Sequence, residues 1–159
     1  MDSDVKKHLL AHGENQRPHK FVTMMNIARE FAKQSACLRN QFGAIIATSD
    51  FTKILAVGYN GPYKGGPNHC RSLVPGKCGC IHAEANCLIK YPFGSHEDTI
   101  MFVTGNPCYN CATMIINADI KLIVYDDNNE YITDRFEGLE LLTHYKATNV
   151  QKLSEFTPQ

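Results

Sequence analysis

The stretch CGCIHAEANCL, at residues 78–88, places a histidine, a glutamate and three cysteines within eleven positions. Its apolar spacing from residue 82 onward is typical of a helix. Residues two apart in the middle of a helix point about 200° apart, so His82 and Glu84 can face one target only where the helix begins. The stretch therefore predicts a helix start that presents a histidine and a carboxylate together.

A second stretch, TGNPCYNCATM at residues 104–114, holds two more cysteines at the start of another expected helix. Asn106 is a good N-cap residue and Pro107 suits the first helical position. Cys108 and Cys111 are three apart and share one face of that helix. The positive end of the helix dipole favours their thiolate forms. By itself, this C-x-x-C is typical of either a metal site or a disulfide redox centre.

Taken together, the two helix starts supply three ligands to one metal ion, the imidazole of His82 and the sulfurs of Cys108 and Cys111. A zinc ion with three protein ligands keeps a fourth position open for water, which is typical of catalytic zinc. Glu84 beside it is then suited to move the proton of that water. The alternative is that Glu84 only stabilises the helix dipole; the histidine and the P-C-x-x-C motif favour the catalytic interpretation.

The rest of the chain alternates between strand and helix patterns. Apolar periodicity predicts helices at 21–36, 82–91, 107–118 and 133–145, and short apolar runs predict strands at 42–48, 53–60, 99–105, 121–127 and near residue 148. Residues 61–80 are rich in glycine and proline and predict a long functional loop, and the last six residues predict a loose tail. This order indicates an α/β sandwich with helices on both faces of a mixed sheet.

Length and composition narrow the class of protein. A chain of 159 residues suits a single domain over residues 1–159. Sixteen basic residues balance sixteen acidic ones, which argues against a dedicated nucleic-acid binder. No apolar run approaches the roughly 20 residues that span a bilayer, and no secretory signal is visible, so we expect no membrane partner and a cytoplasmic location. The seven cysteines then indicate metal or redox chemistry, although Cys87 fits a helix core.

The pair H-x-E and P-C-x-x-C is typical of zinc-dependent nucleobase deaminases. The chain resembles the cytidine deaminase superfamily, and most closely its deoxycytidylate (dCMP) deaminase branch, over about residues 20–145. The stretches that carry the resemblance are CLRNQFGAIIA, GYNGPYKGGPNHC, HAEANCL, NPCYNC and IKLIVYDDNNEY, in that order.

The resemblance implies a three-layer α/β/α sandwich around a mixed five-stranded sheet. It also implies that His82, Cys108 and Cys111 hold a catalytic Zn²⁺ and that Glu84 shuttles protons to N3 of cytosine and to the leaving amine. The implied reaction converts dCMP and water to dUMP and ammonia, which supplies dUMP for thymidylate synthesis.

The resemblance further implies a set of substrate contacts. Asn60, at the end of a strand, matches an asparagine that contacts the sugar, although an asparagine before glycine is also a common turn residue. Ala83 matches a small residue that packs against the base. Tyr131 resembles a tyrosine that lines the substrate site.

Many members of the branch are hexamers that dCTP with Mg²⁺ activates and dTTP inhibits, and the resemblance implies a similar homo-oligomer here. The residues expected at the effector are Asn60, Gly61 and Lys64, with Arg29 or Arg39. Some relatives also hold a second, structural zinc. For that site we expect Cys37, His69, Cys78 and Cys80, with Cys70 as the rival ligand; the alternative is that these loop residues bind no metal.

Four other functions compete with this interpretation. A tRNA adenosine deaminase shares the zinc motifs but would need a basic face for its polyanionic substrate. A nucleoside deaminase would need neither the long loop nor a cation for a 5′-phosphate. A thiol redox protein would use Cys108 and Cys111, and a non-catalytic zinc module would have no need of Glu84.

Overall fold

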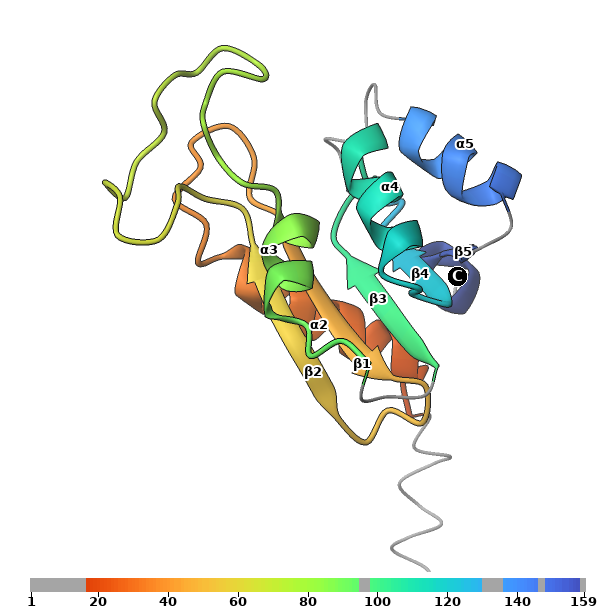
Figure 1. The fold of residues 1–159 in the computed structure, drawn as a ribbon. Helices are drawn as coiled ribbons and strands as arrows, with labels where there is room; N and C mark the ends of the chain where they lie inside the picture. The colour runs from red at the N-terminus through yellow and green to blue at the C-terminus, as the bar shows by residue number, and fades with distance from the viewer. Residues whose placement is uncertain (1–16, 95–97, 130–135, 146–147, 158–159) are drawn as a thin grey trace, which may run out of the picture.

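A computed structural model of the chain describes residues 17–94, 98–129, 136–145 and 148–157. Five strands form one sheet in the order β2-β1-β3-β4-β5 (Figure 1). The strands are β1 (Gly43–Thr48), β2 (Ile54–Tyr59), β3 (Thr99–Val103), β4 (Leu122–Tyr125) and β5 (Asn149–Lys152). Strand β1 runs antiparallel to β2 and β3, whereas β3, β4 and β5 run parallel. The predicted mixed five-stranded sheet is therefore confirmed.

Helices cover both faces of this sheet. They are α2 (Lys20–Ala32), α3 (Ala83–Lys90), α4 (Tyr109–Asn117) and α5 (Phe136–Tyr145), followed by the short 3₁₀ helix η1 (Leu153–Phe156). Helix α2 packs on one face with η1, and α3, α4 and α5 lie on the other, so the three layers are also as predicted (Figure 1). Among the described residues, no helix is long and apolar enough to cross a membrane.

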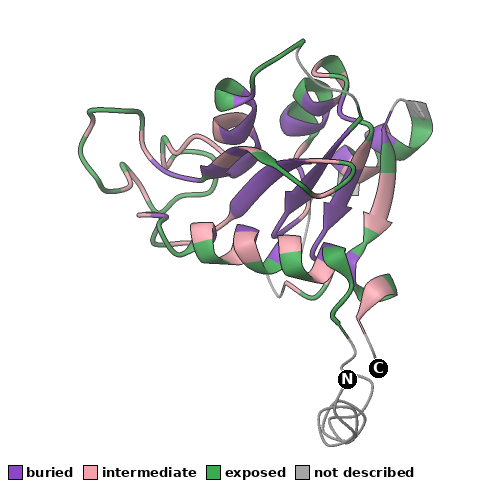
Figure 2. Cartoon of the chain, turned by 90° about the horizontal axis from the view of Figure 1, so that it is seen from below, coloured by how far each residue is buried: buried purple, intermediate pink, exposed green. Residues whose placement is uncertain are grey.

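The strands bury side chains on both sides, as strands covered by two helical layers must. Ile45 and Phe102 point toward α2, whereas Ile46 and Met101 point toward α3 and α4. Figure 2 shows the resulting buried layer running through the middle of the molecule. Cys87 lies fully buried in the core between the sheet and helices α3 and α4. Burial raises the pKa of its thiol to about 12. It is thus a core residue, as its sequence position predicted.

Two glycines let the helices approach the sheet closely. A Cβ atom on Gly43 would lie 2.0 Å from the carbonyl oxygen of Ala28 in α2. A Cβ atom on Gly58 would lie 2.3 Å from the carbonyl oxygen of Ala83 in α3. No side chain fits at either point, so the position of α3, and of the histidine that precedes it, depends on Gly58.

The predicted helix boundaries were wrong in two places. Helix α2 ends at Ala32 rather than at residue 36, because the chain turns there and the hydroxyl of Ser35 accepts the N–H of Cys37 instead. Helix α4 begins at Tyr109, not at Pro107, and its cap is Cys108 rather than Asn106.

The predicted loose tail was also wrong for its first residues. Residues 153–156 form η1, where Leu153 is buried and the ring of Phe156 packs 4.7 Å from that of Phe21. Asp127 fixes this helix, since its carboxylate accepts hydrogen bonds from the N–H and the hydroxyl of Ser154.

Candidate metal centre and substrate pocket

His82 lies at the N-cap of α3, in extended backbone directly before the first helical residue. The chain before it is fixed by a bridge between Gly61 and Ile81, which exchange backbone hydrogen bonds of 3.1 and 2.7 Å. This bridge closes the long loop of residues 62–80, so the end of β2 and the start of α3 are held together. His82 and Glu84 therefore both lie at the start of α3, as predicted.

Cys108 and Cys111 lie at the start of α4. The sulfur of Cys108 accepts the backbone N–H of Cys111 at 3.5 Å and so caps the helix. Helix α5 supports this turn from outside, since a Cβ atom on Gly138 would lie 2.1 Å from the carbonyl oxygen of Pro107. The two sulfurs are thus held by local backbone geometry and by close packing.

The two helix starts meet and bring together three metal-ligating atoms. Nδ1 of His82 lies 3.4 Å from the sulfur of Cys108 and 3.5 Å from that of Cys111. A tetrahedral zinc ion, with a Zn–N bond of about 2.0–2.1 Å and Zn–S bonds of about 2.3 Å, holds nitrogen and sulfur about 3.5 Å apart. The three side chains therefore fit zinc in both type and spacing.

Without a metal, the two cysteines share one proton. A hydrogen bond from the Cys111 thiol lowers the pKa of Cys108 to about 3, with a further contribution from His82. Donating that hydrogen bond raises the pKa of Cys111, and burial and the charge of Glu84 raise it further. A cation that replaces this proton would bind two thiolates, which is the form that zinc prefers.

Glu84 is 5% exposed and lines a pocket beside the three ligands. The pocket comprises about 510 Å³ of space between protein atoms, part of which is open to solvent. Its charge acts on Cys111, so the carboxylate lies near the metal-ligating atoms without belonging to their group. Ala83, fully buried, lines the same pocket.

Asn60 also lines this pocket, and its side chain fixes the segment of residues 40–42 that lines it too. Its Oδ1 accepts the N–H of Phe42 and its Nδ2 donates to the carbonyl of Asn40, both at 2.8 Å. Each polar group retains capacity for one more hydrogen bond. Tyr131, the other residue that we expected to contact the substrate, lies outside the described residues.

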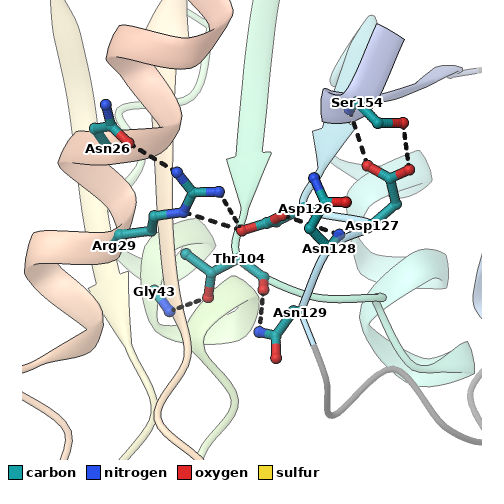
Figure 3. A network of polar contacts seen from close by, with 9 residues as sticks. All are labelled: Asn26, Arg29, Gly43, Thr104, Asp126, Asp127, Asn128, Asn129 and Ser154. Carbon is teal, nitrogen blue, oxygen red and sulfur yellow. Dashed lines mark hydrogen bonds and ion pairs between the residues drawn. The ribbon is translucent and has the colours of Figure 1, made fainter. Parts of the chain in front are cut away.

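The residues expected at an effector site divide into three groups. Gly61 and Lys64 lie at the base of the long loop, next to the bridge that precedes His82. Arg29 instead donates two hydrogen bonds, of 3.0 and 2.7 Å, to the buried carboxylate of Asp126, as Figure 3 shows. Arg39 lines the same pocket as Glu84.

The loop cysteines form a second cluster. The sulfurs of Cys37, Cys70 and Cys80 lie within 4.8 Å of one another, and those of Cys70 and Cys80 are 3.6 Å apart. Cys78 contacts this group through a hydrogen bond with Cys80. The set differs from the expected one because Cys70 points inward, whereas the exposed ring of His69 lies against the carbonyl of Cys70.

Two pocket residues were not anticipated as such. The sequence indicated a helix cap for Asn106 and an effector contact for Arg39, but both residues line the pocket beside Glu84. The side-chain Oδ1 and Nδ2 of Asn106 are buried without a hydrogen-bond partner. The only signal in the sequence was proximity, since Asn106 is two residues from Cys108 and Arg39 is two residues from Cys37.

Comparison with known sequences agrees with this site. The family model described as "Cytidine and deoxycytidylate deaminase zinc-binding region" matches residues 9–126. The deoxycytidylate deaminase of Mycobacterium phage D29 is 31% identical over 127 residues, which are 69% of this chain and 95% of the phage protein. The human deoxycytidylate deaminase is 27% identical over 139 residues, which are 80% of this chain and 76% of the human protein.

Solved structures agree as well. The dCMP deaminase of cyanophage S-TIM5 in its apo form superposes with a TM-score of 0.69 at 28% identity, over 87% of this chain and 100% of that one. The same phage enzyme in complex with dCMP and dUMP has a TM-score of 0.66 at 26% identity, over 96% of this chain and 99% of that one.

Proposed function

The chain belongs to the cytidine and deoxycytidylate deaminase family of hydrolytic enzymes, and we propose that it converts dCMP and water to dUMP and ammonia at a zinc site formed by His82, Cys108 and Cys111. The observation that carries this proposal is the spacing of their three ligand atoms, which matches tetrahedral zinc, beside a buried glutamate. The S-TIM5 relative, crystallised with dCMP and dUMP, supports this choice of substrate.

When bound, the zinc supplies a water molecule acidic enough to act as a nucleophile near neutral pH. Glu84 accepts one proton of the attacking water and delivers it to N3 of cytosine, then moves the second proton of that oxygen to the amine that leaves C4. Its burial keeps competing solvent away from this carboxylate. Such a general acid–base residue contributes about 10²–10⁴-fold to the rate.

The pocket walls position the nucleotide. Ala83 leaves room for the base because its side chain is small, and the second N–H of the Asn60 carboxamide is available for the sugar. We assign Tyr131 to the same substrate site on its sequence position alone.

The proposed substrate is tested by ammonia release from purified protein incubated with dCMP, deoxycytidine, dCTP and single-stranded DNA. We expect dCMP to have the highest kcat/KM. Preferred turnover of the nucleoside or of the polynucleotide would contradict dCMP as the substrate. A protein without bound zinc whose Cys108 and Cys111 cycle between dithiol and disulfide would instead support the redox function.

We also propose a second, structural zinc at the loop cluster, bound by Cys37, Cys70, Cys78 and Cys80. Two zinc-bound sulfurs lie about 3.8 Å apart, close to the 3.6 Å between Cys70 and Cys80. Four cysteines complete a closed tetrahedral site. Wild-type protein should then contain two zinc ions per chain, and Cys70→Ser should contain one while it keeps the catalytic ion. Equal zinc content in the two proteins would rule out the second site.

Regulation by dCTP with Mg²⁺ and by dTTP is proposed at Asn60, Gly61 and Lys64, in a hexamer. The bridge from Gly61 to Ile81 connects this part of the loop to the residue before His82, so a nucleotide bound there would act on the metal ligand through this bridge. We place Arg39 in the substrate pocket instead, and Arg29 is already paired with Asp126. Steady-state kinetics should show inhibition by dTTP that Lys64→Gln weakens, and sedimentation should give the mass of six chains; unchanged inhibition or a monomer mass would contradict these two proposals.

A further inference from the structure

Arg39 is the only lysine or arginine among the described residues that line the substrate pocket. The pocket also contains the carboxylate of Glu84, which would repel a second negative charge. A nucleoside monophosphate brings about two negative charges into this space. A positively charged side chain in the pocket is therefore needed to stabilise the phosphate of such a substrate there.

The backbone that carries Arg39 is fixed from two sides. The sulfur of Cys37 accepts hydrogen bonds from the backbone N–H groups of Arg39 and Asn40. On the pocket side, the carboxamide of Asn60 bonds the carbonyl of Asn40 and the N–H of Phe42. The position of Arg39 at the pocket is thus preorganised, which lowers the entropy lost when it binds a ligand.

The side chain of Arg39 is half-buried and makes no hydrogen bond or ion pair within the described residues. Arg29 shows the contrast, because its guanidinium is bound by Asp126 and Asn26. A guanidinium has five N–H donors in a planar fork that matches two phosphate oxygens at once. A fixed backbone with an unpaired guanidinium at a pocket is the arrangement expected of an anion-binding residue.

We propose that Arg39 binds the 5′-phosphate of the substrate and so selects nucleoside monophosphates over nucleosides. This assignment rests on the proposed function, and it replaces the effector role that the sequence position indicated for Arg39. Arg39 supplies the positive charge that the substrate requires. Its guanidinium and the phosphate form charge-assisted, bidentate hydrogen bonds.

The test compares KM for dCMP with KM for deoxycytidine in wild-type protein, Arg39→Gln and Arg39→Lys. We expect Arg39→Gln to raise KM for dCMP by about 10- to 100-fold and to leave KM for deoxycytidine within about twofold, with Arg39→Lys in between. Lys53→Gln is the matched control, since it removes the same charge at the exposed opposite end of β2 and should leave both KM values unchanged.

An unchanged KM for dCMP in Arg39→Gln, or an equal loss for both substrates, would overturn this role. Calorimetric binding of dUMP and deoxyuridine makes the same comparison without turnover. If the wild-type protein did not deaminate dCMP, the proposed function would be wrong. That outcome differs from an unchanged KM in Arg39→Gln, which would contradict only the role of Arg39.

Asn106 also lines the pocket. Both polar atoms of its carboxamide are buried without a hydrogen-bond partner, a state that costs stability in a ligand-free protein. Asn106 is two residues before the metal ligand Cys108, and the base must reach this end of the pocket to react. We infer that the Asn106 carboxamide binds the pyrimidine base, whose edge offers both hydrogen-bond donors and acceptors.

This role predicts opposite effects on stability and on binding. Asn106→Ala removes no hydrogen bond from the free protein, so its melting temperature should stay the same or rise, whereas KM for dCMP should rise about tenfold. Asn60→Ala, which removes two hydrogen bonds, should lower the melting temperature. A lower melting temperature for Asn106→Ala, or an unchanged KM, would contradict the base contact.

Discussion

Nδ1 of His82 lies 3.4 Å from the sulfur of Cys108, although 26 residues separate them in the chain. The contact exists because α3 and α4 both start at the same edge of the sheet, one after the bridge to Gly61 and the other after β3. The metal site is thus a property of the fold, which brings two local motifs together.

Cys108→Ser should abolish tight binding of the catalytic zinc, because it replaces a thiolate ligand by a weakly acidic hydroxyl. Cys87→Ala is the matched control: it removes a buried thiol from the core and should cost about 1–2 kcal/mol of stability without changing metal content. Metal analysis of both purified variants checks this expectation. Wild-type zinc content in Cys108→Ser would exclude Cys108 as a ligand.

The pKa of Cys108 predicts how its reactivity depends on pH after chelation of the metal. Because that pKa is lowered to about 3, the sulfur of Cys108 is ionised throughout pH 5–8. Alkylation at Cys108 should therefore vary little across this range, whereas Cys87, with its pKa raised to about 12, should stay unmodified. Mass spectrometry of the alkylated peptides measures both. A rate at Cys108 that rises tenfold per pH unit would show an ordinary thiol, and reloading with zinc should protect it.

The Arg29–Asp126 pair should contribute to stability by joining α2 to the end of β4 (Figure 3). Arg29→Ala leaves the buried carboxylate of Asp126 without its two strongest donors. We expect a loss of about 1–3 kcal/mol, at the lower end because the Arg29 side chain is 40% exposed. Lys33→Ala, which breaks an exposed pair with Glu30 on the same helix, should change stability by less than about 0.5 kcal/mol. Urea unfolding of the two variants measures the difference, and equal midpoints would refute this role for Asp126.

Gly58→Ala should displace α3 from the sheet, since the added methyl group would meet the backbone of Ala83 and Cys87 at 2.3 and 2.5 Å. Overpacking of this kind costs about 1–3 kcal/mol. Activity should fall as well, because α3 begins next to His82. Gly61→Ala adds a methyl group in open space and should leave the melting temperature within a degree or two of wild type. A thermally unaffected Gly58→Ala would show that α3 does not need this close approach.

The layers of the fold and the clustering of His82, Cys108 and Cys111 could be predicted from the sequence, because both depend on local patterns. Apolar spacing separates helices from strands, and the His82 and Cys108 motifs each lie at a helix start. The boundaries near these motifs were less accurate: Cys108 caps α4 with its own sulfur, an interaction that ordinary capping preferences do not include.

The rest of the site depends on contacts between distant segments. The loop of residues 61–80 has no periodicity, so the sequence could not show that Cys70, rather than His69, turns inward toward Cys37. Arg29 pairs with Asp126, which is 97 positions away in the sequence. Arg39, and not Arg29, therefore lines the pocket. Tertiary geometry alone distinguishes these alternatives.

The kcat for dCMP of Glu84→Gln, measured on folded protein that carries its catalytic zinc, tests whether Glu84 moves the proton of the attacking water. Glutamine keeps the size and polarity of the side chain but cannot accept the proton of the attacking water. We expect kcat to fall by about 10²–10⁴-fold at unchanged zinc content. A zinc-loaded variant with a kcat within a few fold of wild type would contradict this role of Glu84.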